Sequence, residues 1–379
     1  MLMKNFLSTA MLAVLLVMAS ACTSKAQSKS GVEATPEEDS AEYTLSILVA
    51  GDLMQHQGQI NAARNSDGTY SYDETFRYVK EEVSSADLAI ANFEVTLGGQ
   101  PYKGYPCFSA PDEYLQATID AGFDVLLTAN NHCLDSRQKG LERTIDMMDK
   151  AKIPHLGTYK NIAERNKNYP FLIEKNGFRV VILNFTYGTN GLQVQAPNVV
   201  NYMDTTEIAR DIKKAKQMKP DIILAIPHWG IEYVLHPNQQ QKDIAAWLLR
   251  KGVDHVIGGH PHVLQPMERR NKAKNGGNVV VYSLGNYVSN MTKVNTDGGA
   301  MVRMDFKKKG RVVTLEDCGY SLVWVSRPQI SGHKNFRIYP VHVPDSMLNA
   351  TERAKRNLFY NNMKALYDKN NIDVPEIKD

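Results

Sequence analysis

Side chains that could do chemistry stand in six short polar clusters of this chain, and each cluster directly follows an apolar run. The clusters are Gly51-Asp52 with His56, Asn92-Phe93-Glu94, Asn130-Asn131-His132 with Asp135, His228-Trp229-Gly230 with Glu232, Gly258-Gly259-His260-Pro261-His262, and Gly285-Asn286. They hold five of the ten histidines of the sequence. Carboxylates, amide oxygens and imidazoles together make ligand sets for manganese, iron or zinc. The clusters therefore indicate a metal site, provided that the fold brings them together.

Each cluster also has an ordinary structural interpretation. An aspartate after a strand often caps a turn, and a single histidine such as His228 is often a hydrogen-bonded core residue. The segment His260-Pro261-His262 differs, because proline stiffens it and alternate residues of an extended chain point to the same side. The coincidence of all the clusters favours the metal site over a series of unrelated turns. The other histidines are expected to be structural: His155, His236, His255, His333 and His342.

The elements that position these clusters are predicted to alternate between strands and helices. Continuous apolar runs, typical of strands covered on both faces, span 45–50, 88–91, 125–128, 177–184, 222–226, 253–257 and 279–283. Helical spacing covers 74–84, 112–121, 138–151, 205–219 and 239–251. Strands of an antiparallel unit are expected at 300–306, 311–316 and 320–325, before a last helix at 347–369. In such an α/β fold the carboxyl ends of the strands share one edge, where ligand sites form.

The amino-terminal residues predict export. Residues 1–22 combine Lys4, a short apolar run and the small residues Ala19 to Ala21 before Cys22, which is typical of a lipoprotein signal peptide. Lipidation of Cys22 would anchor the chain to a bacterial membrane, on its periplasmic or extracellular face. Ordinary secretion, with Cys22 removed or free, is the alternative. Residues 23–42 contain almost nothing apolar and are predicted to be a flexible tether.

Charge and cysteine content narrow the function classes. The formal net charge of +3 gives no strong field that would favour nucleic acid as a partner. Beyond Cys22 only Cys107, Cys133 and Cys318 remain, an odd number that matches no disulfide scaffold or zinc module. A disulfide between Cys107 and Cys133 is the pairing to test.

From about residue 45 to 288, the clusters resemble the bacterial capsule synthesis protein CapA, or poly-γ-glutamate synthesis, family within the calcineurin-like metallophosphatases. The motifs that carry this resemblance include Ala129-Asn130-Asn131-His132, His228-Trp229-Gly230-Ile231-Glu232-Tyr233 and Ser283-Leu284-Gly285-Asn286. The resemblance implies a four-layer αββα sandwich of two mixed sheets flanked by helices. Residues 43–300 would form the metallophosphatase-type domain, and residues 301–379 would add antiparallel strands to the second sheet and a terminal helix.

The resemblance also implies a centre of two divalent metal ions and a role for each residue around it. Glu94 would bridge the ions, Asp52 and His262 would hold one, and Asn131, His228 and His260 would hold the other. His56 follows Asp52 by four residues instead of the family's two, so it is a further ligand candidate at an unusual spacing. His132 would protonate the leaving group, with Asp135 orienting it. The substrate pocket would include Asn92, Trp229, Glu232, Tyr233 and Asn286.

Two functions fit these expectations. The first is a metal-dependent hydrolase that cleaves a phosphoester, or an amide of an anionic cell-surface polymer, outside the cytoplasmic membrane. The second is a non-catalytic component that binds, exports or anchors capsular polymer together with other capsule-synthesis proteins. The metal ligand set favours the first function, whereas the tether and the family's role in capsule synthesis favour the second.

Overall fold

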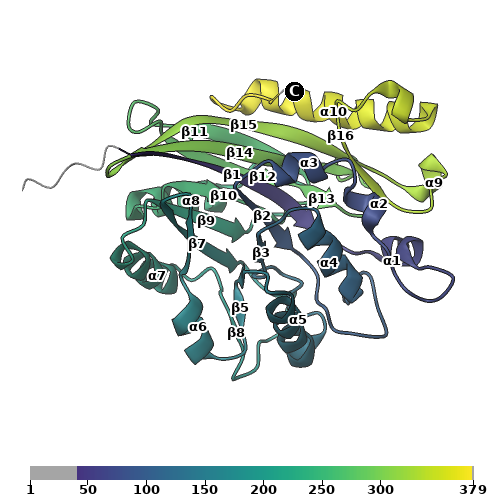
Figure 1. The fold of residues 1–379 in the computed structure, drawn as a ribbon, viewed down its shortest axis with the longest axis horizontal. Coiled ribbons are helices and arrows are strands. Elements are labelled where there is room, and N and C mark those ends of the chain that lie inside the picture. The colour runs from purple at the N-terminus through teal and green to yellow at the C-terminus, as the bar shows by residue number, and fades with distance from the viewer. Residues whose placement is uncertain (1–40, 378–379) are drawn as a thin grey trace, which may run out of the picture. The chain divides into compact units, whose positions relative to one another are not determined.

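The computed structural model describes residues 41–377, which belong to one compact unit built on two mixed β-sheets (Figure 1). The first sheet has the order β16 (Arg337–Pro340), β15 (Val312–Ser326), β14 (Gly298–Lys309), β1 (Glu42–Leu53), β2 (Leu88–Phe93), β3 (Val125–Leu127) and β4 (His155–Leu156), and β13 (Asn286–Val288) also pairs with β1. The second sheet has the order β11 (Leu264–Arg270), β12 (Asn278–Leu284), β10 (His255–Ile257), β9 (Ile222–His228), β7 (Phe178–Thr186) and β6 (Phe171–Lys175). A small pair joins β5 (Thr158–Tyr159) to β8 (Val199–Val200).

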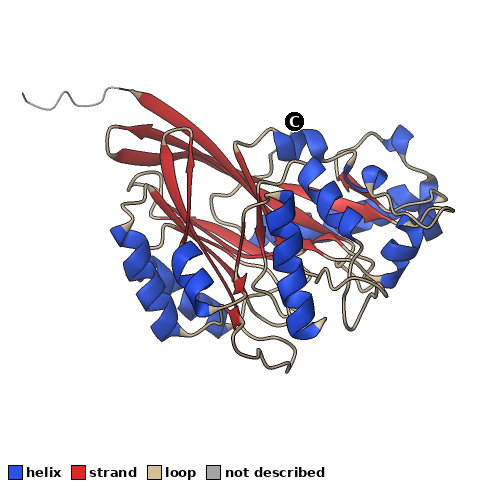
Figure 2. Cartoon of the chain, turned by 60° about the horizontal axis from the view of Figure 1, so that its bottom comes forward, coloured by secondary structure: helices blue, strands red, loops and turns tan. Residues whose placement is uncertain are grey.

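Helices lie on both sides of the strands (Figure 2). They are α1 (Gln57–Ala63), α2 (Asp73–Phe76), α3 (Lys80–Ser84), α4 (Asp112–Asp120), α5 (Arg137–Ala151), α6 (Ile162–Asn168), α7 (Thr205–Gln217), α8 (Gln239–Lys251), α9 (Pro328–Ser331) and α10 (Ala350–Asn370), with a 3-10 turn at η1 (Asp345–Met347). The helix α10 packs along β11 and β15. Among the described residues, no helix is both long and apolar enough to cross a membrane.

Alternation along β1 shows how the layers are built. Leu45, Ile47 and Val49 face the second sheet and share a core with β7, β9, α7 and α8. Leu48 and Ala50 point to the opposite face, where they pack with residues of α2, α3 and α4. Because side chains of a strand alternate between its two faces, one continuous apolar run serves both layers. The predicted sandwich of two mixed sheets flanked by helices is confirmed.

The predicted elements are largely present, with two differences. The expected helix at 74–84 is two short helices, α2 and α3, because the chain leaves helical geometry at Val79 (φ −115°). The expected strands at 311–316 and 320–325 are one strand, β15. Its pairing with β14 shifts register between Asp305 and Phe306, and this β-bulge lets β15 continue through the polar residues between the two predicted strands. The predicted domain division at residue 300 falls inside β14.

Cys107 and Cys133, the pair to test for a disulfide, are not bonded to each other. Both thiols are free, as is that of Cys318. Cys107 is exposed, whereas Cys133 is buried and packs with Leu141 and Ile145 beneath α5. The predicted signal peptide, the lipidated Cys22 and most of the tether lie outside the described residues.

The two sheets approach closely at the carboxyl ends of their strands. The chain leaves β12 of the second sheet, turns at Gly285 and pairs with β1 of the first sheet as β13. Asn184 of β7 bridges the sheets, since its side chain accepts a hydrogen bond from Ala129 N (2.8 Å) and donates one to Ile226 O (2.9 Å). Gly157 fills the remaining space, and a Cβ there would lie 2.3 Å from Ala129 N and 2.4 Å from Asn184 Oδ1.

We predict that Gly157→Ala destabilises the protein, because φ at this position is +124° and the new methyl group would meet a backbone atom. The expected loss in the free energy of unfolding is about 2–4 kcal/mol, the combined cost of the backbone strain and the clash. Chemical denaturation measures it. Gly68→Ala is the matched control, since Gly68 has a φ of +88° with open space around it and should lose only about 1–2 kcal/mol. Equal losses in the two variants would show that the sheets do not need this close approach.

Candidate metal centre

Residues from both sheets meet where the strands end. Asp52 lies near the end of β1, Glu94 directly follows β2, and His228 ends β9. Loops after β3 and β10 add the remaining residues of the predicted ligand set. All six side chains are at most 2% exposed: Asp52, Glu94, Asn131, His228, His260 and His262.

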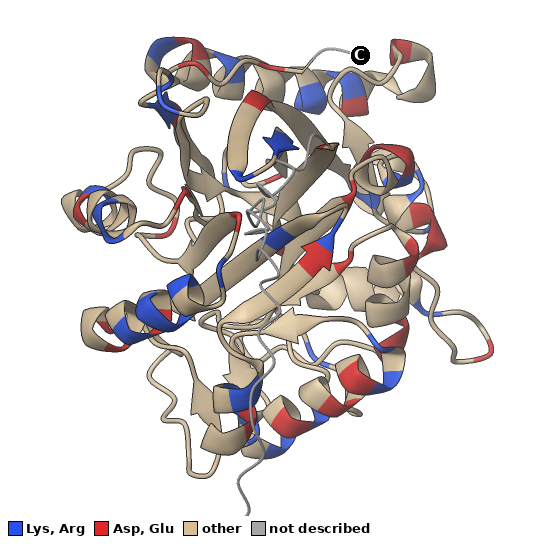
Figure 3. Cartoon of the chain, turned by 60° about the vertical axis from the view of Figure 1, so that its left-hand side comes forward, with Lys and Arg blue, Asp and Glu red and all other residues tan. Residues whose placement is uncertain are grey.

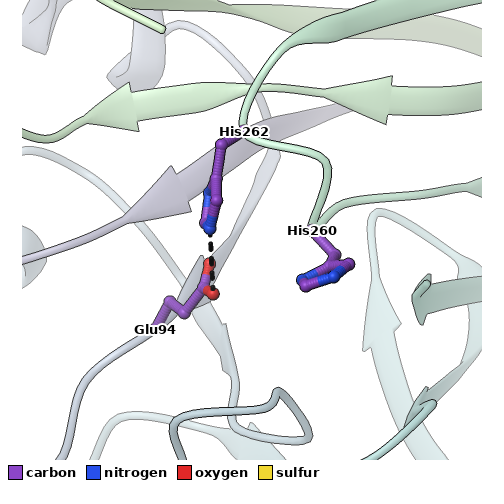
Figure 4. A group of neighbouring side chains, drawn as sticks. All are labelled: Glu94, His260 and His262. Carbon is purple, nitrogen blue, oxygen red and sulfur yellow. Dashed lines mark ion pairs between the residues drawn. The ribbon is translucent and has the colours of Figure 1, made fainter. Parts of the chain in front are cut away.

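The donor atoms of these residues form two overlapping groups. Asp52, Glu94 and His228 form one group, and Glu94, His260 and His262 form the other, with the donor atoms of each group within 4.8 Å of one another. Glu94 is common to both groups, which is the arrangement that a bridging carboxylate requires. Figure 4 shows the ring of His262 pointing at the Glu94 carboxylate, at an Oε1–Nε2 distance of 3.9 Å, with His260 beside them on the same loop.

Other close contacts run across these groups. His228 Nε2 lies 2.6 Å from Asn131 Oδ1 and 3.4 Å from Glu94 Oε1. Asp52 Oδ2 lies 3.4 Å from His262 Nδ1. These contacts join residues that the family resemblance assigns to the same ion, His228 with Asn131 and Asp52 with His262. The two donor groups instead combine residues assigned to different ions, so how the ligands divide between two ions stays a prediction.

Two buried atoms at the centre indicate that a cation fits it. Glu94 Oε1 and His260 Nδ1 are buried and have no hydrogen-bond partner. Leaving a carboxylate oxygen and an imidazole nitrogen buried without a partner is expensive, because neither regains the hydrogen bonds that it makes in water. A divalent ion with a preference for mixed nitrogen and oxygen ligands compensates both atoms at once.

Burial and mutual charge shift the pKa values within the centre. Burial, followed by the charge of Asp52, raises the pKa of Glu94 well above its usual value. Burial opposes the charged form of His262 too, but Glu94 and Asp52 outweigh it and raise the pKa of His262 to about 9. Burial opposes ionisation of Asp52, but His262 and His228 outweigh it and lower its pKa. Burial lowers the pKa of His228 to about 4 and lowers that of His260 as well.

Two asparagines hold these ligands in place. Asn92 Nδ2 donates to Asp52 Oδ1 (2.7 Å) and to Glu94 Oε2 (3.2 Å), so one amide links both carboxylates. Asn286 Oδ1 lies 3.0 Å from His262 Nδ1, which leaves His262 Nε2 directed at Glu94. Both asparagines are buried within the centre, and their role in a substrate pocket stays a prediction.

His132 and Asp135 form a separate pair beside the centre. His132 Nδ1 lies 2.7 Å from Asp135 Oδ2, and the same oxygen accepts a hydrogen bond from Phe108 N. The ring of Phe108 packs edge-on against His132 at a centroid distance of 4.6 Å. Asp135 therefore fixes the orientation of the imidazole and leaves Nε2 as its free nitrogen.

Other predicted site residues lie around the centre. His56 is outside both donor groups, and its Nδ1 accepts a hydrogen bond from Asn290 N (3.3 Å). Trp229 is 1% exposed and its indole donates to Tyr282 O (2.9 Å), so it supports the floor of the site and has no face free for a substrate. Glu232 is exposed, and Tyr233 lies at the rim, 6.2 Å from the ring of His262.

The sequence clusters did not mark Tyr187 and Asn190, in the loop after β7. The ring of Tyr187 lies 4.5 Å from that of His260, and Asn190 Oδ1 accepts a hydrogen bond from Asn131 Nδ2 (3.1 Å). Burial, with the charges of Glu232 and Glu94, raises the pKa of Tyr187 to about 12, so its phenol keeps its proton at neutral pH. The only sequence signal for these residues is that they follow one of the predicted strands.

We predict that binding of Mn²⁺ releases a proton. His262, with a pKa of about 9, carries a proton at pH 7 in the metal-free protein and must lose it to bind a metal. His228 and His260, with lowered pKa values, are already neutral. The apparent affinity for Mn²⁺ should therefore rise at least about tenfold per pH unit between about pH 6.5 and 8.5.

Isothermal titration calorimetry in buffers of different ionisation enthalpy measures this proton release directly. The observed heat should change with the buffer at pH 7. An affinity that is independent of pH, together with a heat that is the same in every buffer, would contradict the proton on His262.

Comparisons with known proteins show which family the chain resembles. A family model described as "Bacterial capsule synthesis protein PGA_cap" matches residues 46–291. The chain is 30% identical to the "Capsule biosynthesis protein CapA" of Bacillus anthracis over 281 residues, covering 71% of this chain and 66% of that protein. It is 29% identical to the "PGA biosynthesis protein CapA" of Bacillus subtilis (strain 168) over 275 residues, covering 70% of this chain and 69% of that protein. The chain thus spans about two thirds of the length of these relatives.

Similar solved structures include the NAD nucleotidase of Haemophilus influenzae, which is 12% identical with a TM-score of 0.47 and covers 88% of this chain and 57% of that chain. A calcineurin-like phosphoesterase of Bacillus subtilis is 15% identical with a TM-score of 0.45, and the match covers 86% of this chain and 98% of that chain. Both TM-scores are below 0.5, so these likenesses add nothing about activity. The match of the family model over residues 46–291 shows that the chain belongs to the PGA_cap family of bacterial capsule synthesis proteins.

Proposed function

We propose that this protein is a metal-dependent hydrolase of capsule biosynthesis, which cleaves a phosphoester or an amide bond in an anionic cell-surface polymer. The observation that carries the proposal is the pair of buried donor groups that share Glu94, whose Oε1 has no hydrogen-bond partner. A structural core has no use for two buried carboxylates surrounded by three histidines, because burying charge is costly. Clustered groups with strongly shifted pKa values are typical of functional sites.

The chain offers ligands for two divalent cations. Glu94 would be shared, and Asp52, Asn131, His228, His260 and His262 would complete the set. When bound, such cations supply Lewis-acid polarisation of the scissile group and neutralise negative charge that develops during hydrolysis. The donor atoms restrict the metal only to a class, because manganese, iron and zinc all suit mixed nitrogen and oxygen ligands.

His132 supplies the proton chemistry of the proposal. Its Nδ1 faces Asp135 Oδ2 at 2.7 Å, so Nε2 is the nitrogen that can hold a proton for the leaving group. The buried Asp135 carboxyl group holds the imidazole in this orientation through the contact at Nδ1. Phe108 limits the rotation of the ring and keeps this nitrogen in place.

The proposed location is outside the cytoplasmic membrane. The small residues before Cys22 support export and lipid anchoring of the mature chain, and residues 23–42 would let the folded unit reach polymer at the surface. The printed names of the relatives refer to capsule and PGA biosynthesis, which supports a polymer substrate and other capsule-synthesis proteins as partners.

We predict that Asp52→Ala and His228→Ala each abolish hydrolysis by the Mn²⁺-loaded protein. Loss of a donor should lower kcat/KM for a generic phosphodiester or monoester, or the rate at which poly-γ-glutamate shortens, by more than about a hundredfold, the upper end of the loss for a supporting residue. His236→Ala is the matched control, because His236 is exposed and outside both donor groups. A metal-replete wild-type protein with no turnover on this panel would contradict the hydrolase.

One observation favours a second candidate function. The relatives are named for the synthesis of polymer and not for its cleavage, which fits a non-catalytic component that binds, exports or anchors the polymer. Such a component would keep the metallophosphatase-type fold for recognition of anionic polymer and would not depend on the individual metal ligands.

Capsule formation in cells separates the two functions. For the hydrolase, we expect Asp52→Ala and Glu94→Ala to abolish capsule formation, because the cleavage step is lost while the protein stays in place. For the non-catalytic component, the same variants should leave the capsule intact, and only Cys22→Ser, which removes the proposed anchor, should disrupt it. Immunoblotting of membrane and soluble fractions checks that Cys22→Ser alone changes the location.

A further inference from the structure

The loop of residues 186–192 closes one side of the metal centre. The ring of Tyr187 lies 4.5 Å from the ring of His260 and 6.5 Å from that of His228, and it is nearly parallel to His228 at 13°. Asn190 lies on the neighbouring side, against Asn131 and His132. One short segment of the second sheet therefore contacts four residues of the centre.

Hydrogen bonds hold this loop in one conformation. Tyr187 N donates to His228 O (3.0 Å), so the backbone of Tyr187 is tied to a candidate ligand. Thr186 N donates to Asn201 O, and the Thr186 hydroxyl donates to Gly188 O (3.0 Å). The Thr189 hydroxyl donates to Leu192 O (2.5 Å). The loop is thus organised before any ligand binds, which lowers the entropy cost of recognition.

Asn190 fixes the amide of Asn131. Asn131 Nδ2 donates to Asn190 Oδ1 (3.1 Å), which turns Asn131 Oδ1 toward His228 Nε2, 2.6 Å away. Only the oxygen of an amide can bind a cation, so this hydrogen bond selects the orientation that binding requires. Asn190 has a φ of +51°, a left-handed conformation that glycine also adopts without strain.

Tyr187 offers a hydrogen-bond donor at the rim. Its side chain is 43% exposed, and its hydroxyl makes no hydrogen bond to any residue in the described part of the chain. The surface beside His260 is therefore open to a ligand on the side of the phenol. An oxyanion held at a metal centre keeps oxygens that face away from the ions, and neutral O–H donors stabilise such oxygens.

We propose that the loop of residues 186–192 is the wall of the site that recognises a tetrahedral oxyanion. Tyr187 is a specificity-determining residue that donates its hydroxyl proton in a hydrogen bond to this oxyanion, and Asn190 is a positioning residue for Asn131. The inference rests on the proposed hydrolase and adds its ligand class. A tetrahedral oxyanion is common to phosphoesters and to the intermediate of amide hydrolysis, so either substrate would use this wall.

Inorganic phosphate is the probe that tests Tyr187, and calorimetry on the full chain loaded with Mn²⁺ measures its affinity. Tyr187→Phe keeps the ring against His260 and removes only the hydroxyl. We expect Mn²⁺ affinity within about twofold of the wild type and a phosphate Kd raised about tenfold or more, as for a lost hydrogen bond to a charged group. Unchanged phosphate affinity in this variant, or a loaded wild-type protein that binds no phosphate, would overturn the role of Tyr187.

The affinity for Mn²⁺ alone tests Asn190. Asn190→Gly keeps the backbone conformation and should weaken Mn²⁺ binding about tenfold, in the range for a residue that supports a ligand. Asn190→Asp retains the acceptor for Asn131 and should restore most of that affinity. Asn176→Gly is the matched control, since Asn176 also has a positive φ (47°) but lies in the turn between β6 and β7. Equal Mn²⁺ affinities for Asn190→Gly and Asn176→Gly would overturn the positioning role.

The same measurements separate this inference from the proposed hydrolase. Phosphate binding that is lost in Tyr187→Phe supports the oxyanion wall even if the wild-type protein hydrolyses none of the substrates offered. Turnover with an undiminished kcat/KM in Tyr187→Phe supports the hydrolase and overturns the wall.

Discussion

Two buried carboxylates, Asp52 and Glu94, are the constraint on which the rest of the structure depends. They share one small volume with His262 and His228, and neither is exposed to solvent. Like charges that are buried together raise the pKa of one partner, as the raised pKa of Glu94 shows. Histidine and the Asn92 amide compensate this charge only in part, because Glu94 Oε1 keeps no hydrogen-bond partner. The fold therefore holds buried donor atoms without partners, which bound cations would satisfy.

Two separate sheets must meet closely to hold these groups, and the backbone shows how. A Cβ on Gly51 would lie 2.2 Å from Gly285 O, so β1 and the crossing segment before β13 approach each other only because that residue is glycine. His260 and His262 adopt φ values of +102° and +58°, which histidine rarely does. Strain of this kind persists where surrounding contacts determine the conformation, and it concentrates at functional sites. The packing of both sheets thus maintains a geometry that the loop alone would not adopt.

The sequence predicted those features of the fold and the site that one structural rule determines for many residues at once. Apolar runs predicted the buried strands, and the polar clusters after them contain all six buried donors, because strand ends of a parallel sheet share one edge. The family resemblance singled out these six among the polar residues of the clusters. The direction of single side chains was not predictable. Trp229 faces the core although its neighbour His228 faces the centre, and Asn286 contacts His262 within the centre. Tyr187 and Asn190 depend on the path of one loop, which leaves no periodic pattern in the sequence.

The charge of the molecule bears on how an anionic polymer would be drawn to this centre. Acidic and basic residues are interspersed along the helices in Figure 3, in keeping with a formal net charge of +3. A surface of mixed sign gives little long-range attraction beyond about 10 Å at moderate salt. At the rim, the Lys293 ammonium lies 3.5 Å above the ring of Tyr233, next to the exposed Glu232, so even there the two signs offset each other. Two divalent cations would outweigh the two carboxylates of Asp52 and Glu94 and leave the centre positive. Under the proposed function, selection of an anion would then depend on the loaded centre and its loop and not on the surface, so recognition would require bound metal.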